Sequence, residues 1–251
     1  MNLKNILIVT LMTTALCGCG SNVFQGFVGE TEKNLLESIE DASTTEDYSR
    51  LITAADEIIN SSTATDAEKV EAHLIKAEAI LGKSNITALD IMAELALSAD
   101  EETNPINVLS TEAPIEDLIA ASTSLAAASD LGDSGNKEQN LMKGIVNTMI
   151  VMNTITEEFI IDENGKIVND VSDYSDSLDN IMFPGDQTDH NIVYYSTQAF
   201  DGFDNSGALT EEQKDEADTI KQKIAEINTL KGKDETDSNI EDQLKTIFQG
   251  F

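Results

Sequence analysis

The feature that most constrains the fold is a series of segments in which apolar residues recur at helical spacing. The first clear segment is followed by Thr65-Asp66-Ala67-Glu68, a capping box in which the Thr hydroxyl and the Glu carboxylate bond the free N–H groups of a first helical turn. Thr44 or Thr45 is the expected cap of the helix before it, and Gly82 the expected end of the helix after it. The apolar residues of the first segment are Tyr48, Leu51, Ile52, Ala55, Ile58 and Ile59.

The same spacing predicts helices along most of the chain. Short connections between them favour antiparallel hairpins, and a composition without Trp, with three Pro and with abundant Ala, Leu and Ile favours helices over a sheet. We therefore predict an all-α fold. The other expected helices cover residues 28–42, 86–97, 115–125, 141–155, 210–227 and 238–247.

Two features interrupt this helical pattern. Asn164-Gly165 separates two short apolar runs and favours a tight turn, which predicts one small β-hairpin over residues 159–168. Residues 98–112 lose their periodicity and are expected to form a long loop, and a possible subdomain boundary, within one helical domain of residues 28–251. The 40% of apolar residues is enough for that domain to bury a sizeable core.

The N-terminus has the layout of a secretory signal. Lys4 precedes an apolar stretch from Ile6 to Leu16, which is too short to cross a membrane, and a small residue, Gly18, precedes Cys19. Leu16-Cys17-Gly18-Cys19 resembles a bacterial lipobox. The resemblance implies that residues 1–18 are removed and that residues 19–27 form a lipidated N-terminus with a short tether.

Of the two cysteines, Cys19 is the expected lipidation site, because the residue before it is small whereas Leu16 precedes Cys17. The resemblance implies a diacylglycerol and a further acyl chain such as palmitate on Cys19, with the lipid bilayer of the cell envelope as a partner. Gly20 and Ser21 after it, by resemblance to Gram-negative lipoproteins, imply the outer membrane, facing either the periplasm or the cell surface. The alternative is an ordinary signal peptide followed by a cysteine without lipid. Because no other Cys follows, that cysteine could not form a disulfide within the mature chain.

A second resemblance concerns the helical hairpins. Residues 72–82, together with Ala88, Leu89 and Ala93, carry small residues where two helices would cross, and the pair over 47–82 is close to a repeat of about 34 residues. The stretch resembles degenerate tetratricopeptide-type hairpins over residues 45–97. The Trp, the Gly-Tyr spacing and the closing Pro of that pattern are missing, so we expect one or two units and not a regular array.

The net charge of −32 disfavours several partners. Phosphate backbones and anionic lipid surfaces are repelled by it, so nucleic acid is not an expected partner and membrane affinity must come from the lipid. The chain also shows no motif for an enzyme: His73 and His190 lack a second ligand at metal-binding spacing, and aromatic residues make up only 5%. We expect no catalytic activity, with a cell-wall hydrolase as the remaining enzymatic alternative.

Calcium is the one candidate cofactor. Asp162-Glu163-Asn164-Gly165 and Asp204-Asn205-Ser206-Gly207 resemble the middle of an EF-hand loop, although both lack acids at the first and last ligand positions. A weak site around residues 162–179 is the functional interpretation, and a solvated acidic loop is the alternative. The candidate ligands are Asp162, Asn164, Asp170, Asp173 and Asp176.

Phenylalanines occur in pairs three residues apart. Phe24 and Phe27, Phe200 and Phe203, and Phe248 and Phe251 would serve either as core anchors or, at the C-terminus, as contacts for a partner. Phe248 and Phe251 are therefore candidate interaction residues. Taken together, these features predict a membrane-anchored lipoprotein that binds or assembles unknown envelope proteins without catalysis; a weak calcium-binding surface module is the alternative.

Overall fold

The computed structural model describes residues 38–39, 41–86, 113–132, 136–161, 166–169, 174–182, 190–230, 239 and 241–244. At some helical positions within these ranges, Asp176 among them, only the backbone is described. The described part is mostly α-helical and confirms the predicted all-α class. Its main helices are α3 (Thr45–Ile59), α4 (Asp66–Lys83), α7 (Ile115–Leu131), α8 (Lys137–Glu158), α9 (Tyr174–Met182), α10 (Ile192–Ser206) and α11 (Glu211–Leu230).

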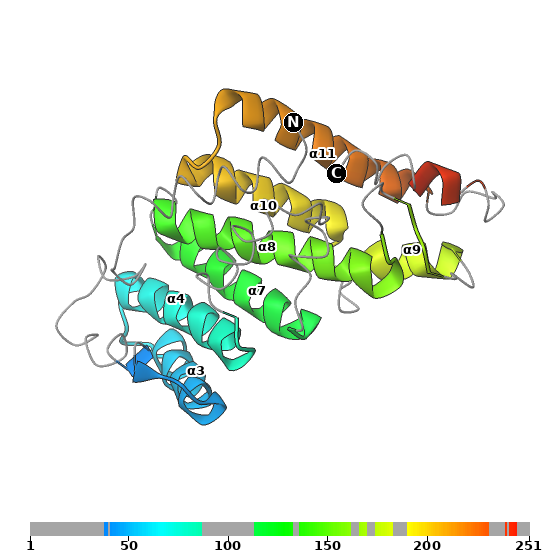
Figure 1. Cartoon of the computed structure of the whole chain (residues 1–251). Coiled ribbons are helices and arrows are strands. Elements are labelled where there is room, and N and C mark those ends of the chain that lie inside the picture. The colour runs from blue at the N-terminus through cyan, green and yellow to red at the C-terminus, as the bar shows by residue number, and fades with distance from the viewer. Residues whose placement is uncertain are drawn as a thin grey trace.

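The helices form a row in which chain order is also spatial order. α3 packs on α4, α4 on α7, α7 on α8, α8 on α10, and α10 on α11, while α9 lies against one end of α8, α10 and α11 (Figure 1). Each helix therefore buries its apolar face mainly against its neighbours in the row. This quasi-one-dimensional packing is typical of helical-hairpin stacks.

Local capping explains where the first two helices begin. At α4 the predicted box is confirmed, since the Glu68 N–H donates to Thr65 Oγ1 (3.3 Å) and the Thr65 N–H donates to Glu68 Oε2 (2.6 Å). α3 has a second box of the same kind, formed by Thr44 and Asp47. Each box satisfies backbone donors that the first turn of a helix leaves without a partner.

Gly82 has a different role from the predicted one. α4 continues through Gly82 to Lys83, so the glycine does not end the helix. A Cβ atom at Gly82 would lie 2.4 Å from Cε1 of Tyr48, whose hydroxyl donates to the backbone oxygen of Ala42 (3.1 Å). Gly82 is thus the position where α4 makes room for an aromatic ring of α3.

α8 supplies the centre of the core. It is covered by α7 on one side and by α10 on the other, and its methionines pack in the core. Residues of α8 that are completely buried include Val146, Met149, Ile150 and Ile155.

The contact between α8 and α10 is made by backbone meeting backbone. A Cβ atom at Gly202 would lie 2.5 Å from the Gly144 nitrogen and 2.6 Å from the Asn140 oxygen, closer than real Cβ atoms approach. One residue along α10, the ring of Phe203 occupies the space where a side chain of Gly144 would be, 2.8 Å from its ideal Cβ position. Phe203 is 5% exposed, which confirms a core anchor at this phenylalanine pair.

α10 corrects the sequence interpretation of residues 204–209. The sequence predicts no helix here and resembles a calcium-binding loop, but Asp204–Ser206 form the last turn of α10. Gly207 ends the helix in the left-handed conformation (φ 75°), and the Ala208 N–H donates to the Phe203 oxygen (3.1 Å). Asp204 instead pairs with Lys214 at the start of α11 (2.9 Å).

The predicted β-hairpin is present in a short form. Ile161 and Ile167 make one antiparallel bridge, and the Val168 N–H donates to the Ile160 oxygen (2.9 Å). Residues 162–165, where the turn was predicted, lie outside the described residues. So do most of the helices predicted over 28–42 and 86–97, half of the one predicted over 238–247, and the whole loop and boundary at 98–112.

The first prediction concerns Gly202. Alanine normally stabilises a helix interior by about 1 kcal/mol relative to glycine, but here the added methyl group would push α10 away from α8. We expect Gly202→Ala to lower the free energy of unfolding by about 1–3 kcal/mol in urea denaturation, the usual cost of overpacking. Asn205→Ala, an exposed position of the same helix, is the matched control and should change stability little. An unchanged or increased stability of Gly202→Ala would contradict this account of the crossing.

Candidate functional site

The site residues predicted from the sequence fall where the structure describes no side chains. Asp176 lies in α9 and is described by backbone alone. The lipidation site, the cation site and the C-terminal contact residues therefore remain predictions. The predicted residues outside the described ranges are Cys19, Asp162, Asn164, Asp170, Asp173, Phe248 and Phe251.

His73 and Ser124 link α4 to α7. The Ser124 hydroxyl donates to the backbone oxygen of His73 (3.0 Å), and its oxygen lies 3.1 Å from Nδ1 of the same histidine. Because the hydroxyl hydrogen is used in the first bond, the imidazole must donate Nδ1–H in the second. A further bond from Ser84 Oγ to Asp117 Oδ2 (2.9 Å) joins the same two helices.

This Ser–His pair has the composition of a catalytic dyad but not its geometry. A nucleophilic serine needs its hydroxyl proton directed at the base, whereas Ser124 directs that proton at a backbone carbonyl. Ser124 is also 4% exposed, so a substrate has no access to its oxygen. The pair positions α4 on α7 and is best described as a packing contact.

Polar side chains also join α7 to α8. Ser122 Oγ donates to Asn147 Oδ1 (2.8 Å), and Gln139 Nε2 donates to Ser129 Oγ (2.9 Å). Buried hydrogen bonds of this kind are directional, so they fix how far one helix can slide along the next. α7 is therefore held in register on both sides by short polar residues.

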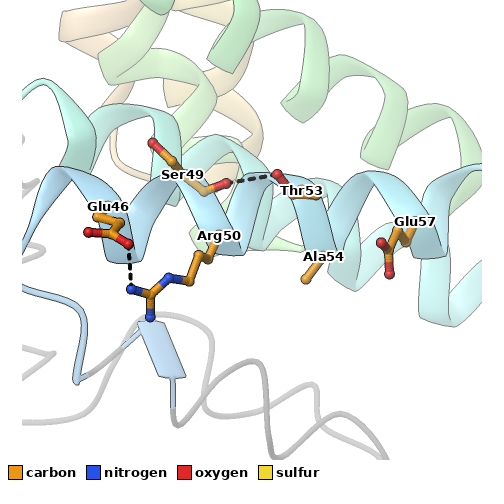
Figure 2. A pocket seen from close by; sticks show the side chains of 6 residues that line it. All are labelled: Glu46, Ser49, Arg50, Thr53, Ala54 and Glu57. Carbon is orange, nitrogen blue, oxygen red and sulfur yellow. Dashed lines mark hydrogen bonds and ion pairs between the residues drawn. The ribbon is translucent and has the colours of Figure 1, made fainter.

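The outer face of α3 carries a hollow of about 380 Å³. Its described lining comes from one stripe of α3, with polar or charged side chains at all positions except one alanine (Figure 2). The stripe lies on the side of α3 that points away from α4. Its residues are Glu46, Ser49, Arg50, Thr53, Ala54 and Glu57.

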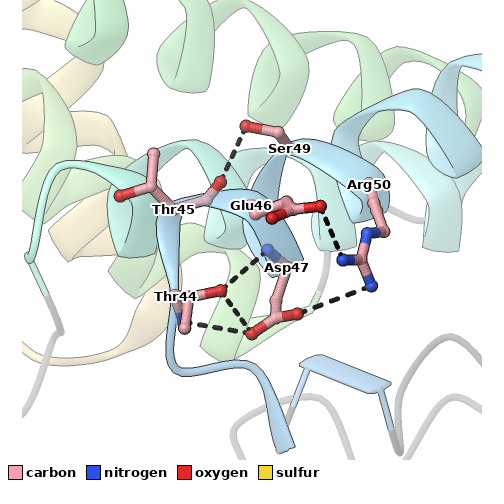
Figure 3. A network of polar contacts seen from close by, with 6 residues as sticks. All are labelled: Thr44, Thr45, Glu46, Asp47, Ser49 and Arg50. Carbon is pink, nitrogen blue, oxygen red and sulfur yellow. Dashed lines mark hydrogen bonds and ion pairs between the residues drawn. The ribbon is translucent and has the colours of Figure 1, made fainter.

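Arg50 is the single arginine of the sequence and stands in this stripe. Its guanidinium is 2.8 Å from Glu46 Oε1 and 3.8 Å from Asp47 Oδ1, and the arginine side chain is 69% exposed (Figure 3). The hydrogen bond from the Thr44 hydroxyl lowers the pKa of Asp47, so this carboxylate is charged at neutral pH. Exposed pairs of this kind stabilise a protein little, and a carboxylate of another molecule can replace Glu46.

A cluster of rings marks the start of α10. The rings of His190 and Tyr194 are tilted by 36° to each other with centroids 4.0 Å apart, and Tyr194 meets Tyr195 edge to face at 5.3 Å. Burial raises the pKa of Tyr195 to about 12, and burial with the charge of Asp130 raises that of Tyr194. Both phenols are therefore neutral hydrogen-bonding groups at physiological pH.

The described residues contain neither a metal centre nor a membrane-spanning helix. They contain no group of three or more His, Cys, Asp or Glu side chains arranged to hold a metal ion. Among the helices described, none combines the length and the apolar character that a membrane span requires. The weak calcium site remains a prediction, because its candidate ligands lie outside the described residues or, for Asp176, are described by backbone alone.

The chain matches no protein-family model, and no match was found among curated proteins or solved structures. The interpretation of the fold and surfaces therefore rests on the residues themselves.

The contacts described here were missed from the sequence for two reasons. Ser122 and Ser124 bond to residues on other helices, and no spacing along the chain indicates such a partner. Arg50 carries a usable signal, because a single arginine among 47 acidic residues is unusual, but it was not among the predicted site residues.

The second prediction concerns the pKa of His73. Burial disfavours the charged imidazolium and Lys76 repels it, so the pKa lies below the ordinary value of 6.5. As the pH falls, the unfolded chain therefore binds a proton at His73 at a higher pH than the folded chain does. The free energy of unfolding is not reduced by this group above about pH 6.5, and it decreases as the pH falls below that value. An NMR titration of the ring should show the lowered pKa, with His190→Gln used to assign the signal. His73→Gln should remove part of the stability loss on acidification. A measured pKa of His73 at or above 6.5 would contradict the expected effect of its burial.

Proposed function

We propose that this protein is a non-catalytic binding module of the cell envelope, tethered by lipid at Cys19, that recognises other envelope proteins through the surface of its helical row. The observation that carries the proposal is the one-dimensional packing from α3 to α11. A row of this kind leaves side faces of successive helices exposed along its length. Such surfaces suit extended contacts with another protein.

The polar links between helices support a rigid surface. Ser124 fixes α7 on α4, and Ser122 fixes α7 on α8, through bonds of 3.0 Å and 2.8 Å to His73 and Asn147. A partner that binds across several helices gains affinity when those helices are already held in place, because less conformational entropy is lost on binding. The same residues are occupied in packing, which argues against a hydrolytic role for the one Ser–His pair described.

The stripe of α3 around Arg50 is one part of this surface. It combines carboxylates, hydroxyls and one guanidinium on an exposed helix face. Polar contacts of this type are typical of protein–protein interfaces that form and separate reversibly. The resemblance to tetratricopeptide-type hairpins, noted for residues 45–97, points to the same kind of role by analogy of architecture alone.

The lipid tether is tested by acyl labelling. Cells that express the full chain and are fed an alkyne-labelled fatty acid should incorporate the label into the wild type and into Cys17→Ser. Cys19→Ser should lose both the label and its attachment to membranes, because it lacks the sulfur that carries the acyl chains, and these chains supply the membrane affinity. Label that persists in Cys19→Ser, or wild-type protein that is washed free of membranes at high salt, would overturn the tether.

Partner binding is tested by photo-crosslinking in the same cells. A photoreactive amino acid is placed at Thr53 of α3, Asp130 of α7 or Thr219 of α11, all exposed positions. We expect at least one position to give reproducible adducts with the same envelope protein. The control is Cys19→Ser, which should lose these adducts because the untethered chain is diluted away from the membrane. The absence of a protein adduct at all three positions would count against the binding function.

A further inference from the structure

The short hairpin separates its apolar side chains into a buried pair and an exposed pair. Ile161 and Ile167, which form the bridge, are 1% and 4% exposed. Their neighbours Ile160 and Val168 are 56% and 54% exposed. Because successive side chains of a strand point to opposite faces, Ile160 and Val168 lie opposite each other on the outward face.

The exposed pair, Ile160 and Val168, is held firmly on the end of α8. The Val168 N–H donates to the Ile160 oxygen (2.9 Å), and the Ile160 N–H donates to Asn169 Oδ1 (2.7 Å). Asn169 Nδ2 in turn donates to the oxygen of Glu158, a residue of the last turn of α8 (2.9 Å). Phe159, directly before the pair, is completely buried. The two aliphatic side chains are therefore presented to solvent from a fixed backbone.

This exposure is unusual for the molecule. In the described part of the chain only Leu131, at 39%, is a further exposed large apolar residue. Single exposed apolar residues are normal on a protein surface, but two neighbouring ones on a fixed backbone form a small continuous apolar patch. A patch that is ordered, apolar and on the outside of the row is suited to insertion into a pocket of another molecule.

The sequence around the exposed pair is acidic. Residues 157–180 contain eight acidic residues and one basic residue, Lys166. Glu157 lies at the end of α8 with an exposed side chain, and partial burial together with the charges of Glu116 and Glu158 raises its pKa. The aliphatic pair thus occupies a strongly negative part of the chain.

Charge decides which occupant fits. A second copy of this chain, with a net charge of −32, would bring a like-charged rim against this one. An anionic lipid surface is repelled for the same reason. A basic rim around an apolar pocket complements both the charge and the two aliphatic side chains.

We infer that Ile160 and Val168 form a docking knob for a protein partner that offers an apolar pocket rimmed by lysine and arginine. The inference rests on the proposed binding function and names the surface and the chemistry of the partner. The aliphatic side chains fill the pocket, while the acidic surroundings attract the partner and orient it. Neither role requires the stripe around Arg50.

The test uses the full chain as isolated from cells and a defined probe. The probe is an amphipathic helical peptide of leucine and lysine, in which an apolar face is flanked by lysines, and a serine–lysine peptide of equal charge measures attraction by charge alone. The variant Ile160→Thr/Val168→Thr keeps the charge and the β-branched character of the strands. Leu131→Thr, at the other exposed apolar residue, is the matched control.

We expect the double variant to bind the leucine–lysine peptide at least tenfold more weakly by fluorescence anisotropy, with less than a twofold change for Leu131→Thr. The serine–lysine peptide should bind the wild type and the double variant equally. Equal binding of the leucine–lysine peptide to the wild type and the double variant would overturn the inference. The inference would also be overturned if the double variant formed fewer dimers, or bound phosphatidylcholine vesicles more weakly, while it bound the peptide as well as the wild type does.

A measurement on the wild-type chain guards against misfolding of the variant. Methyl NMR signals of Ile160 and Val168 should shift when the leucine–lysine peptide is added, and signals that stay in place would overturn the inference. The binding function itself is judged separately by the crosslinks from Thr53, Asp130 and Thr219. If those crosslinks form but the peptide does not bind at the exposed pair, only the inference of a docking knob is wrong. If no crosslink forms, the proposed binding function fails as well.

Discussion

The close approach of α8 and α10 at Gly144 and Gly202 is the constraint on which the rest of the row depends. With backbone against backbone, Phe203 can cover Gly144 and the completely buried side chains of α8 can fill the space between α7 and α10. A core packed at this density tolerates little change in helix spacing. The positions of α7 on one side of α8 and of α11 on the far side of α10 follow from it.

Local signals in the sequence were sufficient for much of the fold. The capping box of Thr65 and Glu68, and the Asn164-Gly165 turn signal between apolar runs, act within a few residues, and both the helix and the bridge were found where they were predicted. α10 was missed because its sequence contains Gly202 and ends in Asp204-Asn205-Ser206-Gly207, which together are typical of a loop. Glycine is favoured at position 202 by its contact with α8, about sixty residues earlier in the sequence. Helix propensity depends on the local sequence and does not reflect such a contact.

The contacts of the candidate surfaces were harder to predict for a related physical reason. Hydrogen bonds such as those of Ser124 with His73 join residues that are distant along the chain, and serine is common in exposed positions as well as in such links. The exposure of Ile160 and Val168 could have been expected in part, since alternation in a hairpin must direct one apolar pair outward. Which pair faces the core is decided by α8 and not by the hairpin sequence.

The row of helices has a consequence for how the molecule opens. Among the described helices, one at the end of the row has a neighbour on one side only, so α3 can separate from α4 at a lower free energy than α8 can leave its two neighbours. Amide hydrogen exchange should then be graded along the row, fastest in the outer helices and slowest in α8. Any protein that contacts several helices at once would couple these separate openings, and so would protect amides well outside the area it covers.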